Sequence, residues 1–259
     1  YNANGPGLPS VSILRRVDIM SFNKDENGGK DRYKLIRFPR SNSPFSYLKS
    51  PTVSILVLNV LAFIMLEIFG SSEDLNTLVV AGAKVNILVQ QGQWWRLITA
   101  MFLHYGLLHI ALNSYSLYNL GTFAERIYGG WRFVVMYITS GLAGNLLSTM
   151  FGQPYVVGVG ASGAIFGIAG SILYLGVRRP ELFKYIIGSR FVTAIAINLV
   201  ISFTIPGIDA WAHIGGLLGG FAIAWALGTP ADDMYGGPAW WKGAIVFGTL
   251  GLMLAYILA

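Results

Sequence analysis

The chain has 259 residues, of which 54% are hydrophobic and only 12% carry a charged side chain. A soluble domain carries about 25% charged residues, so this composition and a mean hydropathy of +0.57 exclude an ordinary water-facing surface. The absence of cysteine excludes disulfides, thiol nucleophiles and thiolate metal sites. The formal charge of +6 fits either nucleic-acid binding or the basic cytoplasmic loops of a membrane protein.

Residues 1–49 form a polar and basic segment that precedes the first apolar stretch. The composition fits a flexible cytoplasmic tail and a fragment of a small cytoplasmic domain equally well. No short cleavable signal pattern opens the chain. Because it starts with Tyr1 rather than methionine, we expect a trimmed or processed N-terminus.

Seven apolar stretches follow, and about 20 residues cross a bilayer as a helix. They cover residues 51–70, 97–121, 131–151, 159–177, 191–208, 210–228 and 243–259. Backbone groups in lipid must be satisfied within the segment, which predicts helices rather than strands. The sequence therefore predicts an all-α, polytopic membrane helix bundle. Between the first two spans, we expect residues 71–95 to lie in the outer interface, with Trp95 and Arg96 at the lipid headgroups.

The positions of the 18 basic residues predict the orientation of the bundle. Sixteen of them fall before the first span or between spans on the same side, and only Lys84 and Arg96 fall on the other side. Cytoplasmic loops carry the excess of Lys and Arg, so the N-terminus is predicted to be cytoplasmic and the C-terminus extracytoplasmic. The charge is then explained by topology, and nucleic-acid binding is not expected.

All three histidines, His104, His109 and His213, lie within or at the edges of apolar spans, where polar side chains are costly and indicate function. His109 and Asn113 are four residues apart and share one helical face, so both can donate hydrogen bonds to one point. His104 and His109 are five apart, about 140° around a helix, which disfavours a two-histidine metal clamp. No metal and no cofactor are expected.

Ser162 lies among glycines at the start of the fourth span, a pattern that by itself also fits close helix packing. Because Ala164 follows at the second position, this is not the Gly-x-Ser-x-Gly elbow of soluble hydrolases. Gly-x-x-x-Gly spacing occurs after Ser162, at 163/167, and twice after His213, at 215/219 and 216/220. Such spacing predicts a close approach of spans four and six that brings Ser162 within hydrogen-bond reach of His213.

These side chains suggest a peptide hydrolysis. Ser162 would attack a peptide carbonyl, and His213 would take its proton and return it to the leaving amine. His109, Asn113 and the backbone N–H of Ser162 would hold the oxyanion.

Five motifs, in order along the predicted spans, resemble those of the rhomboid family of intramembrane serine proteases. They are Trp95-Arg96, His104…His109…Asn113, Gly121-x-x-x-Glu125-x-x-x-Gly129, Gly160-x-Ser162-Gly163 and Ala212-His213-x-x-Gly216-x-x-x-Gly220. The resemblance covers residues 51–228, and the seventh span is similar to the six-plus-one arrangement of bacterial-type members.

The resemblance implies a Ser162–His213 dyad without a catalytic acid, with His104, Phe166, Gly160 and Gly163 as possible supporting residues. It also implies cleavage of single-span membrane proteins near the outer interface of the cell membrane. Phe166 stands where some members carry tyrosine, so its packing on the imidazole is expected but no hydroxyl role is. Asp209 is expected to cap the sixth span rather than to complete a triad.

We therefore expect a cytoplasmic segment at 1–49, a protease core of six helices at 50–228, and a linker with a seventh helix at 229–259. Within the core, Glu125 and Arg126 are expected to form a structural ion pair. The competing hypothesis is a non-catalytic rhomboid-like factor that binds and escorts membrane helices. A histidine-based metal or haem carrier and a transporter are disfavoured by the histidine spacing and by the lack of charged residues for ion coupling.

Overall fold

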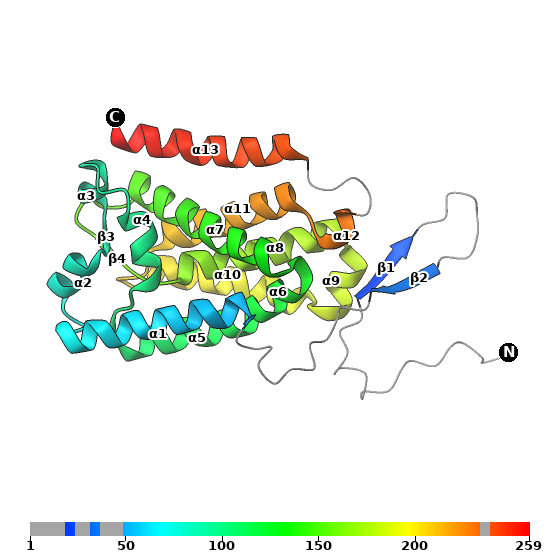
Figure 1. The fold of residues 1–259 in the computed structure, drawn as a ribbon, viewed down its shortest axis with the longest axis horizontal. Helices are drawn as coiled ribbons and strands as arrows, with labels where there is room; N and C mark the ends of the chain where they lie inside the picture. The colour runs from blue at the N-terminus through cyan, green and yellow to red at the C-terminus, as the bar shows by residue number, and fades with distance from the viewer. Residues whose placement is uncertain (1–18, 24–31, 37–48, 234–238) are drawn as a thin grey trace. The chain divides into compact units, whose positions relative to one another are not determined.

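The computed structural model describes residues 19–23, 32–36, 49–233 and 239–259, and the chain divides into two units, Tyr1–Ser46 and Tyr47–Ala259. The described part of the first unit is an antiparallel hairpin of β1 (Ile19–Asn23) and β2 (Arg32–Ile36), drawn in blue in Figure 1. Most of the predicted N-terminal segment 1–49 lies outside the described residues.

The second unit is helical, with one short pair of strands (Figure 1). Its elements in chain order are α1 (Pro51–Phe69), α2 (Leu75–Ala81), β3 (Lys84–Val85), α3 (Asn86–Gln90), α4 (Arg96–Thr99), the 3-10 turn η3 (Ala100–Phe102), α5 (Gly106–Ser116), the π turn η4 (Leu117–Gly121), α6 (Thr122–Tyr128), α7 (Gly130–Phe151), β4 (Val157–Gly158), α8 (Ser162–Arg178), α9 (Pro180–Ile186), α10 (Ser189–Thr204), α11 (Ala210–Leu227), α12 (Pro230–Asp233) and α13 (Trp240–Leu258).

The predicted multi-pass helical membrane fold is confirmed by the length and apolarity of these helices. Within the described residues, α1, α7, α11 and α13 are long and apolar enough to cross a bilayer on their own. The shorter apolar helices α8 and α10 have 17 and 16 residues and correspond to the fourth and fifth predicted spans. The count of seven spans stays a prediction, because these two helices are shorter than the roughly 20 residues that cross a bilayer.

The boundaries predicted for the second span are wrong. Residues 96–102 form a separate short stretch, and the long helical stretch starts only at Gly106 and runs to Tyr128, bent by 91° from the first. The physical reason is Gly106, whose φ of +71° turns the chain between the two parts. The apolar residues 97–105 are therefore not part of the continuous helical stretch that the sequence predicts.

The core of the second unit is built from α7, α8 and α11. Half or more of the apolar windows of α7 and α11 are buried, 61% and 50%, against 22% for α1 and 11% for α13. Glycines let the backbones approach, as their spacing predicts. A Cβ on Gly216 or Gly220 would overlap the carbonyl of Gly163 or Gly167 on α8.

The neighbouring glycines of α11 serve the other partner helix. A Cβ on Gly215 would lie 2.7 Å from the Ala143 carbonyl oxygen of α7, and one on Gly219 would lie 2.5 Å from the Ala143 Cβ. The two overlapping Gly-x-x-x-Gly pairs thus face two different helices, and α11 packs closely against both.

The loop after α1 is folded against the protein and does not project from it. β3 pairs with β4 through Lys84–Gly158 and Val85–Val157, which ties this loop to the segment that leads into α8. Arg96 is only 9% exposed and donates hydrogen bonds to the carbonyls of Val79 and Ala83. The guanidinium is therefore held within the protein by carbonyls of α2 and of the residue before β3 and, contrary to the prediction, does not extend to the headgroups.

At the other end of the bundle, Glu125 does not pair with Arg126 as predicted. Its carboxylate accepts hydrogen bonds from the hydroxyls of Ser50 and Thr52 and from the backbone N–H of Thr52, at 2.6–3.1 Å. The free N–H groups at the start of α1 attract an anion, so Glu125 fastens α6 to the first turn of α1.

Candidate active site

Ser162 is the first residue of α8, and the turn before it requires glycine. Gly160 has φ of +120°, a backbone conformation that L side chains rarely adopt, and its N–H donates to the Ala100 carbonyl at 2.9 Å. Ser162 therefore enters the helix from a fixed turn. Its backbone N–H belongs to the first turn of α8, where N–H groups have no partner within the helix.

His213 lies in the first turn of α11 and faces Ser162 across the helix pair. The Ser162 Oγ is 2.9 Å from the His213 Nε2, and the imidazole is 7% exposed. The glycine contact described above, Gly216 against the Gly163 carbonyl, lies directly beside this pair and sets its separation. Two residues that are 51 positions apart in the sequence are thus brought to hydrogen-bond distance.

Two further side chains hold the imidazole of His213. The Phe166 ring stacks on it, with the ring centroids 4.2 Å apart and an interplanar angle of 19°. This is the packing role expected of that position. On the other ring nitrogen, the Oγ of Ser202, on α10, lies 2.7 Å from the His213 Nδ1.

Ser202 was not among the residues predicted from the sequence. A lone serine in an apolar span is common and by itself indicates no function. Ser202 lies one helical turn before Pro206-Gly207, where the chain turns toward His213, and this nearness in sequence could have suggested a contact with His213.

His109 and Asn113 lie on α5, on the face that the i, i+4 spacing predicts. The point where a Cβ of residue 160 would lie is 2.8 Å from the His109 Nε2 and 3.8 Å from the Ser162 Oγ, so both atoms border one small volume. The Tyr105 N–H donates to the His109 Nδ1 at 3.4 Å, which leaves the proton of a neutral ring on Nε2. The Asn113 side chain donates to the His109 carbonyl at 3.0 Å and keeps one amide hydrogen free.

His104 is completely buried and supports the site from behind. Its Nε2 accepts the Ala161 N–H at 3.4 Å, and its ring meets that of His109 edge-on at 5.2 Å between centroids. His104 thus holds the residue that precedes Ser162.

Asp209 is the N-cap of α11, as predicted, and is part of a buried polar cluster. Its carboxylate accepts the Ala212 N–H at 3.0 Å, pairs with the Lys84 ammonium at 3.1 Å and hydrogen-bonds to the Ser148 hydroxyl. Lys84 also donates to Ser148 and is completely buried. Asp209 is therefore turned away from the imidazole, whose Nδ1 has Ser202 as its partner.

This cluster has a defined electrostatic character. Burial lowers the pKa of Lys84, and the Asp209 carboxylate opposes that shift. Burial would raise the pKa of Asp209, but Lys84 and the hydrogen bonds from Ser148 and Ala212 outweigh it and hold that pKa below its usual value. Lys84 and Ser148 were not singled out in the sequence, where Lys84 looked like an ordinary loop lysine.

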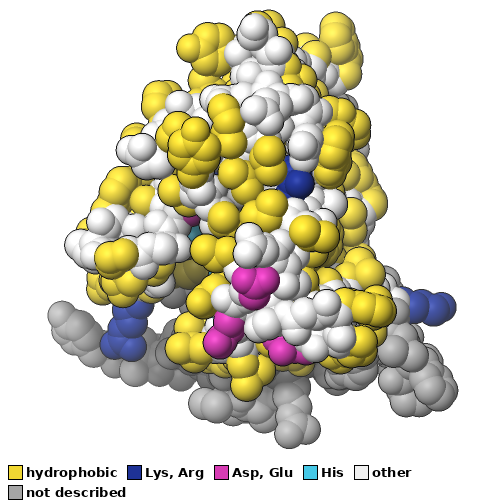
Figure 2. All heavy atoms as spheres, turned by 90° about the vertical axis from the view of Figure 1, so that its left-hand side faces the viewer, with side chains coloured by type: hydrophobic (Ala, Val, Ile, Leu, Met, Phe, Trp, Pro, Cys, Tyr) yellow, Lys and Arg dark blue, Asp and Glu magenta, His cyan; other side chains and the backbone are white. Residues whose placement is uncertain are grey.

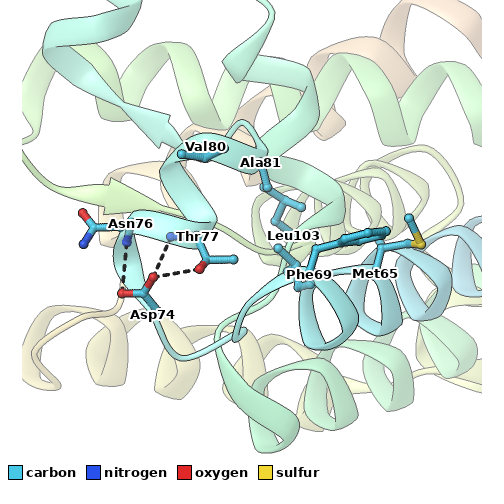
Figure 3. A pocket seen from close by; sticks show the side chains of 10 residues that line it. Met65, Phe69, Asp74, Asn76, Thr77, Val80, Ala81 and Leu103 are labelled. Carbon is cyan, nitrogen blue, oxygen red and sulfur yellow. Dashed lines mark hydrogen bonds between the residues drawn. The ribbon is translucent and has the colours of Figure 1, made fainter.

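A separate cavity of about 600 Å³ lies between α1 and α2 (Figure 3). Its lining is mainly apolar, with Met65, Phe69, Val80 and Leu103, and Asp74 at its edge accepts the N–H of Thr77 at 2.9 Å. Neither Ser162 nor His213 lines it. Among the residues that the structure describes, no group of three or more His, Asp or Glu side chains could hold a metal ion.

The chain is similar to known proteins over most of its length. The family model described as "Rhomboid domain" matches residues 91–230. Rhomboid protease GluP of Bacillus subtilis is 42% identical over 199 residues, which cover 77% of this chain and 38% of that protein. The chain thus spans well under half of GluP.

Two further relatives are covered more completely. YdcA of Bacillus subtilis is 39% identical over 140 residues, 54% of this chain and 70% of that protein. Rhomboid-like protease 1 of Toxoplasma gondii is 30% identical over 244 residues, 89% of this chain and 81% of that protein. The matched region contains Ser162, His213, His109 and Asn113. By these matches, the chain belongs to the rhomboid family.

Proposed function

We propose that this rhomboid is an intramembrane serine endopeptidase, a hydrolase whose reacting groups are Ser162 and His213. The observation that carries the proposal is the 2.9 Å contact between the Ser162 Oγ and the His213 Nε2, between two apolar helices. A serine hydroxyl is a weak nucleophile until a base removes its proton, and the unprotonated imidazole nitrogen is such a base. The relatives named rhomboid protease support the same reaction class.

In this proposal the Ser162 Oγ attacks the peptide carbonyl while His213 takes the proton. The imidazolium then returns that proton to the leaving amine, and water repeats the sequence to release the acyl group from Ser162. No carboxylate takes part, because Asp209 is engaged by Lys84, Ser148 and Ala212. Stacking on Phe166 keeps the ring in the orientation that both transfers require.

The negative charge that develops on the carbonyl oxygen needs donors in the same small volume. The His109 Nε2 borders the space beside the Ser162 Oγ, the free amide hydrogen of Asn113 lies on the same helix face, and the Ser162 N–H is unpartnered within α8. Loss of one such donor typically lowers turnover by about 10²–10³. We therefore assign His109 and Asn113 to the oxyanion hole.

The substrate class follows from the position of the site. A helix of 17 residues is about 25 Å long, shorter than the roughly 30 Å hydrocarbon core. Because Arg178 at its other end is expected at the cytoplasmic surface, we expect Ser162 to lie below the opposite surface. With the orientation predicted from Lys and Arg, that surface is the outer one. We propose transmembrane-helix substrates, single-span proteins above all, cut near the outer interface.

Cleavage of a model single-span protein in proteoliposomes tests the proposal. Ser162→Ala and His213→Ala are expected to abolish cleavage, whereas His109→Ala and Asn113→Ala are expected to lower kcat by about 10²-fold with a smaller change in KM. A fluorophosphonate probe is expected to label Ser162 in the wild type and not in His213→Ala. Cleavage that persists in Ser162→Ala, or a wild type that the probe does not label, would contradict the dyad.

A further inference from the structure

We propose that Ser202, on α10, is a positioning residue that fixes the tautomer of His213. The proposal rests on the proposed function, because it concerns the ring that would act as the base. A neutral imidazole carries its proton on either Nδ1 or Nε2, and only the first form leaves Nε2 free to accept a proton from Ser162. Something in the structure must favour that form.

The hydrogen bonds of Ser202 make this choice. Its side chain is 4% exposed, and its Oγ is 2.7 Å from the Asn198 carbonyl oxygen and 2.7 Å from the His213 Nδ1. A hydroxyl has one hydrogen to donate and two lone pairs that accept. A carbonyl oxygen can only accept, so the single hydrogen of Ser202 is committed to Asn198. Toward His213 the Ser202 oxygen can act only as an acceptor.

The proton of a neutral His213 therefore lies on Nδ1. The Nε2, left without a proton, accepts the hydrogen of the Ser162 hydroxyl at 2.9 Å. The chain Ser162 → His213 → Ser202 → Asn198 is then one directed series of hydrogen bonds with every donor matched to an acceptor. In the reverse direction Ser202 would donate to the His213 Nδ1, and its oxygen would then lie 2.7 Å from the Asn198 carbonyl oxygen with no hydrogen between them.

Ser202 fills the place that a carboxylate holds in a Ser-His-Asp triad. It orients the ring but carries no charge, so it stabilises the imidazolium less than a carboxylate would. Asp209, although it lies only four residues before His213, is held by Lys84 and the N–H of Ala212. Ser202 and Ile195 are the buried residues of α10.

The tautomer can be read directly by ¹⁵N NMR of the full chain labelled on histidine, in detergent at neutral pH. The chain has only three histidines, and the signals absent from His213→Ala belong to His213. We expect a protonated Nδ1 and an unprotonated Nε2 in the wild type. Ser202→Ala is expected to add the form protonated on Nε2, and Ser202→Thr, which keeps the hydroxyl, is expected to restore the first form.

Kinetics on the same proteins give the second readout. Ser202→Ala is expected to lower kcat about tenfold with KM unchanged, the effect of one lost hydrogen bond, and Ser202→Thr to recover most of it. The matched control is Ser171→Ala on α8. Ser171 is equally buried and hydrogen-bonded to the Ile168 carbonyl at 2.7 Å, and does not contact His213. The control is expected to keep kcat.

A wild type whose His213 is protonated on Nε2 overturns the proposal, and this measurement does not require any variant to fold. A Ser202→Ala protein in which the tautomer of His213 and the kcat are both unchanged also overturns the proposal. If the wild type cleaves no substrate, the proposed function fails, but the ¹⁵N spectrum still decides whether Ser202 sets the tautomer.

Discussion

At the scale of single residues, the geometry of the site depends on Gly160 for two independent reasons. Its φ of +120° disfavours any other residue, and a Cβ there would lie 2.8 Å from the His109 Nε2. The first is a matter of backbone stability, whereas the second concerns the space beside Ser162. The two effects can be separated by comparison with Gly92, which has φ of +97° and no atom within 4 Å of the position that a Cβ would take.

Gly160→Ala is expected to abolish most cleavage, about 10²-fold or more in kcat, because it displaces the His109 ring as well as straining the turn. Gly92→Ala carries only the strain, about 1 kcal/mol, and is expected to keep its kcat. Thermal unfolding in detergent and turnover of a single-span substrate would be measured for both. Equal losses of activity in the two variants would show that strain alone explains the effect.

At the scale of elements, the separation of α8 and α11 fixes the distance between Ser162 and His213. Small residues allow this contact, and Gly216 lies directly against the Gly163 carbonyl with no room for a side chain. An added methyl group must therefore push one helix away from the other. On α13, by contrast, Gly251 has nothing within 4 Å of a Cβ.

Gly216→Ala is expected to destabilise the protein by about 1–3 kcal/mol, the usual cost of overpacking, and to reduce fluorophosphonate labelling of Ser162. Gly251→Ala, a matched helical glycine, is expected to alter neither property. Denaturation in detergent and probe labelling measure the two effects. A Gly216→Ala protein that labels at the wild-type rate would argue that the dyad tolerates a wider helix spacing.

A second set of contacts between elements is the buried polar cluster of Lys84, Asp209 and Ser148. It joins β3, α7 and the start of α11. Removal of one charge of a buried pair leaves the other without compensation. At neutral pH, Asp209→Asn is expected to lower the free energy of unfolding by about 3 kcal/mol. Glu181→Gln, which breaks the exposed pair with Lys184, is expected to change it by less than about 1 kcal/mol.

The same pair predicts an acid-dependent stability. The pKa of Asp209 is held below its usual value in the folded protein, so its stabilisation is present above the unfolded-state pKa of about 3.9 and is lost as the pH falls through the folded value. The difference between wild type and Asp209→Asn should therefore be full at pH 6 and should shrink below about pH 4. Thermal unfolding at both pH values tests this, and a difference that stays constant would remove Asp209 as the cause.

At the scale of the whole second unit, the two ends of the bundle differ in charge. Figure 2 looks onto the end that carries α2 and α3, where hydrophobic and uncharged side chains cover most of the surface and acidic side chains gather on one part. Lys84 and Arg96, the two basic residues that the order of the predicted spans puts on this side, are 0% and 9% exposed. The exposed Arg126, Arg178 and Arg190 lie between the predicted spans on the other side, in α6, at the end of α8 and at the start of α10.

This asymmetry predicts an outer location for the end with α2 and α3. The chain has no cysteine, so single cysteines report accessibility without background. In intact cells, Glu73→Cys is expected to react with a membrane-impermeant maleimide, whereas Arg190→Cys is expected to react only after permeabilisation; both side chains are exposed. The opposite pattern of labelling would reverse the proposed orientation and place the cut at the inner interface.

The sequence alone indicated the lipid surroundings of this protein, its helical class and the candidate residues Ser162, His213, His109 and Asn113, because each of these rests on local properties. Apolar runs specify helices in lipid, and the four-residue spacing places His109 beside Asn113 on one helix face. The glycine spacing predicts the close packing of α8 on α11. The break at Gly106 was missed because hydropathy stays high through residues 97–105 and does not report a positive φ.

Only the tertiary structure decided which polar groups are partners. Arg96, Lys84 and Glu125 all look like surface charges in the sequence, yet each is drawn to backbone or side-chain groups from distant elements. Ser202 joins His213 for the same reason, across a turn whose geometry no local pattern specifies. Hydrogen bonds act over about 3 Å, and residues far apart in sequence come that close only after the helices have packed.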